Sequence, residues 1–212
     1  MDTNELIKAL AADARRPGLT MNATWRGAAA GALMLAGLVF FMMLGPRPDI
    51  ATAVETVRFL FKFVVTIALA AAAFATMRVA AWPEAELRRM LPYLGVAPAL
   101  VLAGVVLELI ALPSDAWGTK LIGTNSMLCL TFIPLIGLAP LALFLLALRH
   151  GAPSRPSLSG ALAGLAAGGI AATFYAAHCP DDSPLFVATW YTIAILGLTL
   201  LGAIAARWAI RW

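Results

Sequence analysis

The chain has 212 residues, of which 62% are hydrophobic and 12% charged, and its formal net charge is +4 at pH 7. Soluble domains are about 45–50% apolar and about 25% charged. This composition excludes a water-soluble globule, because too little polar surface is present to cover one. A bilayer-spanning helix takes about 20 mostly apolar residues, so the chain can hold roughly six such helices and no separate soluble domain.

Six apolar segments follow one another along the chain and predict an all-α integral membrane bundle of six transmembrane helices. The segments cover residues 27–45, 59–81, 93–112, 126–148, 160–177 and 186–206. We therefore expect two parts, a cytoplasmic amphipathic N-terminal segment (1–26) and a six-helix transmembrane domain (27–212).

The distribution of positive charge predicts the orientation of these helices. Eleven of the 15 Lys and Arg residues fall in or beside segments 1–26, 82–92, 149–159 and 207–212, which alternate topology places on one side of the membrane. The other four fall in or beside the segments on the opposite side. Segments rich in Lys and Arg stay in the cytoplasm. The first 20 residues are also too polar for a signal peptide. We expect a multi-pass protein of the bacterial inner (cytoplasmic) membrane with both termini cytoplasmic. Its positive charge is explained by its orientation in the lipid bilayer, and we expect no direct binding of nucleic acid.

The N-terminal segment contains one short amphipathic pattern. Leu6, Ile7 and Leu10 share a helical face before Arg15 and Arg16. Such a helix either lies in the membrane interface with its arginines near lipid phosphates, or docks in the groove of a partner protein through the three apolar residues. The sequence leaves both interpretations open.

The two cysteines of the chain, Cys129 and Cys179, are predicted near the outer face, separated by two membrane crossings. Disulfides persist on that side, so the pair is expected to form a structural disulfide or to respond to oxidants or metal ions. His178 precedes Cys179, and imidazole and thiolate suit Cu, Zn or Cd. A histidine at an interface is also often a simple hydrated group, so a three-ligand site remains one of two interpretations. No cofactor is expected to be obligatory.

Ionisable groups are scarce inside the predicted spans. Lys62 and Glu108 are predicted at similar depth, so we expect a structural ion pair between them. The sequence shows no nucleophile–base pair, no phosphate-binding loop and no pair of carboxylates at mid-depth. We therefore do not expect an enzyme.

The segment His178–Phe186, followed by Trp190 and Tyr191, resembles the NrsF family of membrane-bound anti-sigma factors. The likeness extends to the polar N-terminal segment, the cysteine that opens the fourth span and the terminal Arg211–Trp212, and so covers nearly the whole chain. The resemblance implies a regulator that holds an extracytoplasmic-function sigma factor at the membrane and releases it under heavy-metal or related stress. It also implies that Cys129 and Cys179 take part in sensing on the periplasmic side, while the helix with Leu6, Ile7 and Leu10 binds the sigma factor.

Two other functions remain as alternatives. A membrane thiol-disulfide oxidoreductase would need reactive cysteines close together in the sequence, which this chain lacks. A small metal or solute transporter would need polar groups along a path at mid-depth, and the apolar segments do not show them.

Overall fold

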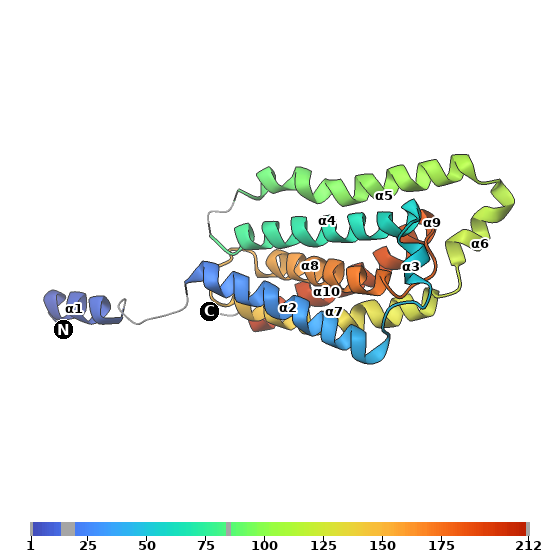
Figure 1. Cartoon of the computed structure of the whole chain (residues 1–212). Coiled ribbons are helices and arrows are strands. Elements are labelled where there is room, and N and C mark those ends of the chain that lie inside the picture. The colour runs from blue at the N-terminus through green and yellow to red at the C-terminus, as the bar shows by residue number, and fades with distance from the viewer. Residues whose placement is uncertain (1, 14–19, 84–85, 211–212) are drawn as a thin grey trace.

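The structure is a computed structural model that describes the chain except residues 1, 14–19, 84–85 and 211–212 (Figure 1). All of the regular structure in the described residues is helical. The long helices are α2 Met21–Met43, α4 Val57–Ala80, α5 Leu91–Ala111, α7 Ser126–Leu148, α8 Pro156–Ala176 and α10 Thr192–Ala209. Shorter ones are α1 Thr3–Asp13, α3 Ile50–Ala53, η1 Leu87–Met90, η2 Ser114–Ala116, α6 Trp117–Ile122, α9 Pro184–Phe186 and the π-helical η3 Val187–Tyr191.

Six helices are long and apolar enough to cross a membrane, as the sequence predicts. Two of them include short helices next to them, since η1 extends α5 and α9 with η3 extends α10. The first begins at Met21 and not at residue 27, because the Thr20 hydroxyl accepts a hydrogen bond from the Ala23 N–H at 3.3 Å and caps the helix there. The end of the predicted N-terminal segment, residues 21–26, is therefore the first turn and a half of α2.

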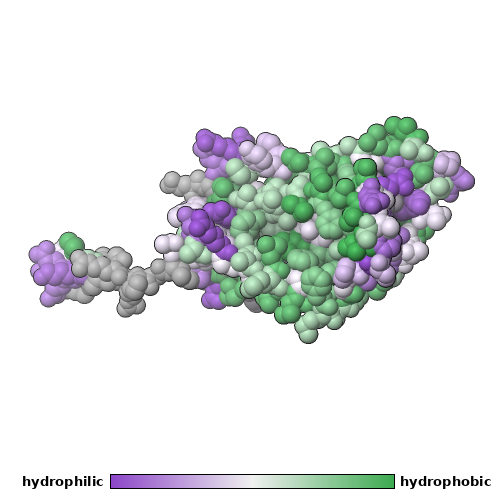
Figure 2. Space-filling view, in the orientation of Figure 1, coloured by the Kyte–Doolittle hydropathy of each residue, from purple (hydrophilic) through white to green (hydrophobic). Residues whose placement is uncertain are grey.

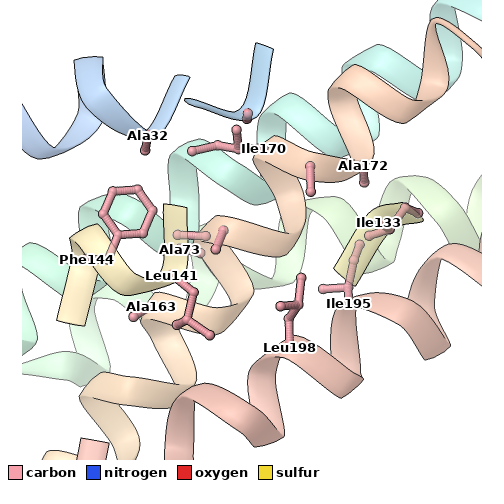
Figure 3. Close-up of a cluster of buried hydrophobic side chains, with 14 of the residues drawn as sticks. Ala32, Ala73, Ile133, Leu141, Phe144, Ala163, Ile170, Ala172, Ile195 and Leu198 are labelled. Carbon is pink, nitrogen blue, oxygen red and sulfur yellow. The ribbon is translucent and has the colours of Figure 1, made fainter. Parts of the chain in front are cut away.

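The six long helices lie side by side, with α8 in the middle of the bundle and α5 at its edge (Figure 1). In α8, 67% of the most apolar window is buried, against 11% for α5. Side chains from α2, α4, α7, α8 and α10 fill one shared hydrophobic core (Figure 3). We name the end of the bundle where α7 begins and α8 ends the cysteine end, and the opposite end, where α2 begins and α4 and α10 end, the terminal end.

Glycines allow α8 and α10 to approach closely. A β-carbon added at Gly164 would collide with the backbone of Leu198, and one added at Gly160 would collide with the carbonyl of Gly202. Small residues at helix contacts permit this packing where helices cannot rely on the hydrophobic effect. The Ala- and Gly-rich composition of α8 thus explains why it occupies the centre.

Gly164→Ala is expected to lower the free energy of unfolding by about 1–3 kcal/mol, because the added methyl group forces α8 and α10 apart. Gly197→Ala is the matched control, since Gly197 lies in α10 with no atom close to the position of an added β-carbon. Thermal unfolding in detergent micelles measures both. Equal stability of the two variants would show that the α8–α10 contact is not tight.

The surface of the bundle is apolar between its two ends. Many large hydrophobic side chains are exposed on the outer helices, for example Met34 at 71% and Ile110 at 78%. Figure 2 shows hydrophobic residues across the middle of the visible face and hydrophilic residues gathered toward the two ends. Contact between such an apolar band and water is unfavourable, whereas contact with lipid chains is favourable.

Candidate functional site

Both cysteines are buried at the cysteine end. Cys129 lies in the first turn of α7, where its N–H donates to the Asn125 carbonyl at 2.8 Å, and Cys179 lies in the loop between α8 and α9. Each is 0% exposed and a free thiol. The Tyr175 hydroxyl donates to the Asn125 carbonyl at 3.4 Å, its ring centre lies 5.8 Å from that of Tyr191, and both tyrosines and both cysteines belong to one hydrophobic core. The structure therefore gathers the predicted pair into one buried thiol–phenol cluster.

Burial raises the pKa of the Cys179 thiol, so the side chain is protonated at neutral pH. The thiolate is the form that binds metal ions and reacts with oxidants. A protonated thiol with no exposed surface is shielded from both reactions in this structure.

A buried lysine holds the cysteine loop in place. Lys62, on α4, is 0% exposed, and its ammonium donates to the Cys179 carbonyl at 2.7 Å. The same Nζ forms an ion pair with Asp182 Oδ1 at 2.6 Å and lies 5.3 Å from the centre of the Phe59 ring. A buried ammonium is costly unless opposite charge and acceptors surround it, so these contacts fix both Lys62 and the loop.

An arginine from the connection between α2 and α3 also binds the cysteine loop. Arg47 Nη1 donates to Asp182 Oδ2 at 2.9 Å and to the Cys179 carbonyl at 3.4 Å. Its other nitrogens donate to both carboxylate oxygens of Asp49 at 2.7 Å. The hydrogen bonds with Asp49 lower the pKa of that carboxyl and raise the pKa of Arg47. The Asp182 carboxylate thus bridges two cations from two different elements.

The neighbouring Asp181 joins the same loop to α7. Its carboxylate accepts hydrogen bonds from the backbone N–H groups of Thr124, at 3.1 Å, and Asn125, at 2.9 Å. A carboxylate at a helix N-terminus satisfies free N–H groups and is stabilised by the helix dipole. Asp181 therefore ties the loop of Cys179 to the turn that carries Cys129.

The imidazole of His178 contacts the connection that follows α2. Its Nδ1 lies 3.0 Å from the carbonyl of Gly45. Because a carbonyl only accepts, Nδ1 carries the proton. Among the described residues, no group of three or more His, Cys, Asp and Glu side chains is placed to hold a metal ion. A metal site of Cys129, Cys179 and His178, one of the two interpretations of the sequence, stays a prediction.

The predicted ion pair between Lys62 and Glu108 is wrong. Glu108, on α5, is 3% exposed, accepts from the Ser183 hydroxyl at 2.6 Å and the Leu185 N–H at 3.0 Å, and pairs with Arg58 at 3.6 Å. The sequence correctly indicates that both groups lie toward the same end. The loop after α8 supplies Asp182 as the partner of Lys62 and Ser183 as a partner of Glu108, while Arg58 lies on α4. The depth of a residue along its helix does not reveal these partners.

The N-terminal pattern forms helix α1, which lies apart from the six long helices (Figure 1). Leu6 is 42% exposed and Ile7 is 57% exposed. The side chain of Leu10 lies outside the described residues. The apolar face of α1 is therefore open to a partner or a membrane surface, as both interpretations of the sequence require.

Sequence reasoning missed Arg47, Asp181 and Asp182 as functional residues. All three lie in segments that the charge distribution predicts on the outer side of the membrane. Four basic and six acidic residues fall on that side. That concentration of opposite charges, next to a cysteine, is the signal that could have indicated the network.

Comparison with known proteins decides the family. The sequence matches the NrsF family, described as Negative regulator of sigma F, over residues 10–212. The chain belongs to the NrsF family. It is 36% identical over 220 residues to "Anti-sigma-F factor NrsF" of Caulobacter vibrioides (strain NA1000 / CB15N), with both chains covered completely. It is 29% identical over 222 residues to "Probable anti-sigma-F factor NrsF" of Azospira oryzae (strain ATCC BAA-33 / DSM 13638 / PS), again with both chains fully covered.

No solved structure matches the chain. The family and the relatives confirm the resemblance that the sequence indicates, and they concern regulators and not catalysts.

Proposed function

We propose that this chain is an anti-sigma factor embedded in the bacterial inner membrane. It holds an extracytoplasmic-function sigma factor at the cytoplasmic face and releases it when the cysteine pair at the periplasmic face reacts with a thiophilic metal ion or an oxidant. Family membership over residues 10–212 carries the anti-sigma assignment. Six long apolar helices and the excess of Lys and Arg at the terminal end support the membrane setting and the orientation.

The N-terminal helix is the proposed contact for the sigma factor. An amphipathic helix binds a partner by laying its apolar face into a groove, and the apolar face of α1 has two exposed large side chains, Leu6 and Ile7. Leu10 continues the same face in the sequence.

The cysteine pair is the proposed sensor. A divalent ion such as Zn or Cd would displace the two thiol protons and bind both thiolates, and Cu(I) would bind in the same way. An oxidant would instead take two electrons and two protons and leave a disulfide. Each reaction needs the loop of Cys179 to open, because both thiols are buried and the network around Lys62 holds that loop. The metal ion shifts the equilibrium from the closed to the opened form of the bundle only as far as it binds the opened form more tightly.

Contacts between α4 and α8 connect the two ends. At the cysteine end, Lys62 of α4 binds the loop that follows α8. At the terminal end, the Ser159 hydroxyl of α8 donates to the Ala80 carbonyl of α4 at 3.2 Å, and the Ala152 N–H donates to the Ala81 carbonyl at 2.9 Å. A shift of α8 against α4 at the cysteine end would therefore also move these contacts at the terminal end.

Co-purification tests the proposal. The full-length protein is expected to co-purify with its sigma factor, and a chain lacking residues 1–16 is not. Ile7→Asp is expected to weaken binding at least about tenfold, because a charge replaces an apolar anchor. Lys8→Asp, on the opposite, polar side of the same helix, is the matched control and is expected to bind normally. Equal binding by the two point variants would overturn the role of α1, and no binding by the full-length protein would overturn the function.

A further inference from the structure

We propose that the terminal end carries a binding site for the phosphate of an anionic phospholipid, in a hollow between the start of α2 and the end of α4. The hollow measures about 1180 Å³ and continues onto the connection from α4 to η1. This proposal rests on the proposed membrane setting and does not depend on the sigma factor.

One wall of the hollow supplies positive charge. Arg78 lies in the last turn of α4, and among the described residues the partner of its guanidinium is the Asn22 amide oxygen, at 3.3 Å. Arg89, from η1, forms an exposed ion pair with Glu86 at 2.6 Å. Arg78, Arg89 and Glu86 all line the hollow, and in the described part of the chain the carboxylate of Glu86 pairs with Arg89 and not with Arg78. The Arg78 guanidinium can therefore take another anion. Arginine binds phosphate through paired N–H groups.

A buried tryptophan supplies a free donor. Trp25 lines the hollow and is 2% exposed, packed edge-on against Phe74 with ring centres 6.0 Å apart. Within the described residues, its indole N–H donates to no other group. An indole N–H can only donate, and this nitrogen is not one of the buried polar atoms that lack a partner in the described residues, so it is open to the hollow that Trp25 lines. A phosphate oxygen in the hollow would satisfy it.

The rest of the lining fits a lipid better than a free anion. Apolar side chains of Met21, Val79 and Met90 line the hollow beside the polar groups. Trp82, 56% exposed, also lines it, and tryptophan favours the level of lipid headgroups. Basic pockets between helices on the cytoplasmic side of membranes bind anionic headgroups. A headgroup phosphate with the start of an acyl chain matches this mixture, whereas inorganic phosphate would leave the apolar wall uncovered.

Native mass spectrometry of the full chain in detergent tests the site, with phosphatidylglycerol and phosphatidylcholine of the same acyl chains as probes. Arg78→Gln is expected to raise the Kd for phosphatidylglycerol about fivefold and to leave phosphatidylcholine binding unchanged. Arg149→Gln is the matched control, because Arg149 is an exposed arginine just after α7 that does not line the hollow.

Equal phosphatidylglycerol affinity of the two variants would overturn the proposal. A chain that binds phosphatidylglycerol as expected but no sigma factor would support this site and contradict the proposed function, so the two failures are distinguishable.

Discussion

Replacing Lys62 with methionine is expected to lower the free energy of unfolding by about 3 kcal/mol, since Asp182 loses one of its two cationic partners and the Cys179 carbonyl loses its 2.7 Å donor. The lysine is 0% exposed, while its partner Asp182 keeps 20% of its side chain exposed. Arg47 still reaches Asp182 in the variant and limits the loss. Thermal or denaturant unfolding in detergent micelles measures the change.

Lys120→Met is the matched control for this variant. Lys120 lies at the same end of the bundle but is exposed, so its loss is expected to change stability by no more than about 0.5 kcal/mol. A double-mutant cycle with Asp182→Asn separates the pair from other effects of each residue. Additive effects of the two substitutions would show that the pair does not hold the loop.

The second large effect concerns release of the sigma factor. Cys129→Ser and Cys179→Ser are each expected to abolish the rise in sigma-dependent transcription that Cd or an oxidant produces, because neither a two-thiolate site nor a disulfide can form with one sulfur. Repression without the stimulus is expected to stay normal, since serine is close to cysteine in size. A reporter gene under a sigma-dependent promoter measures both states.

Met127→Ser controls for the general loss of sulfur near the site. Met127 lies in the same first turn of α7 as Cys129 but is 73% exposed. This variant is expected to respond to the stimulus as the unchanged protein does. Full induction in both cysteine variants would contradict the sensing part of the proposal and leave sigma binding unaffected.

The six helices could be predicted from sequence because each is decided locally. About 20 consecutive apolar residues suffice for a spanning helix wherever they occur, and the fourth segment, residues 126–148, agrees with α7 at both ends. The start of α2 was missed because a single capping hydroxyl, that of Thr20, outweighs the polar residues that follow it.

The ion pairs could not be predicted, because they depend on how helices rotate and on where loops fold back. Lys62 and Glu108 have similar depth, yet they bind different residues. Lys62 pairs with Asp182, whereas Glu108 binds Ser183 and Arg58. The placement of the two cysteines in one cluster likewise depends on Asp181, which reaches from that loop to the start of α7. A sequence shows the depth of a residue in a helix but not its neighbours on other elements.

The fraction of the sigma factor that sediments with membranes tests the central claim most directly. Cells that contain the full chain are expected to hold most of the sigma factor in the membrane fraction, and cells that lack it are expected to hold the sigma factor in the soluble fraction. Addition of Cd or an oxidant is expected to move it from the membranes to the soluble fraction. A sigma factor that is equally soluble with and without the chain would contradict the claim that this protein captures it at the membrane.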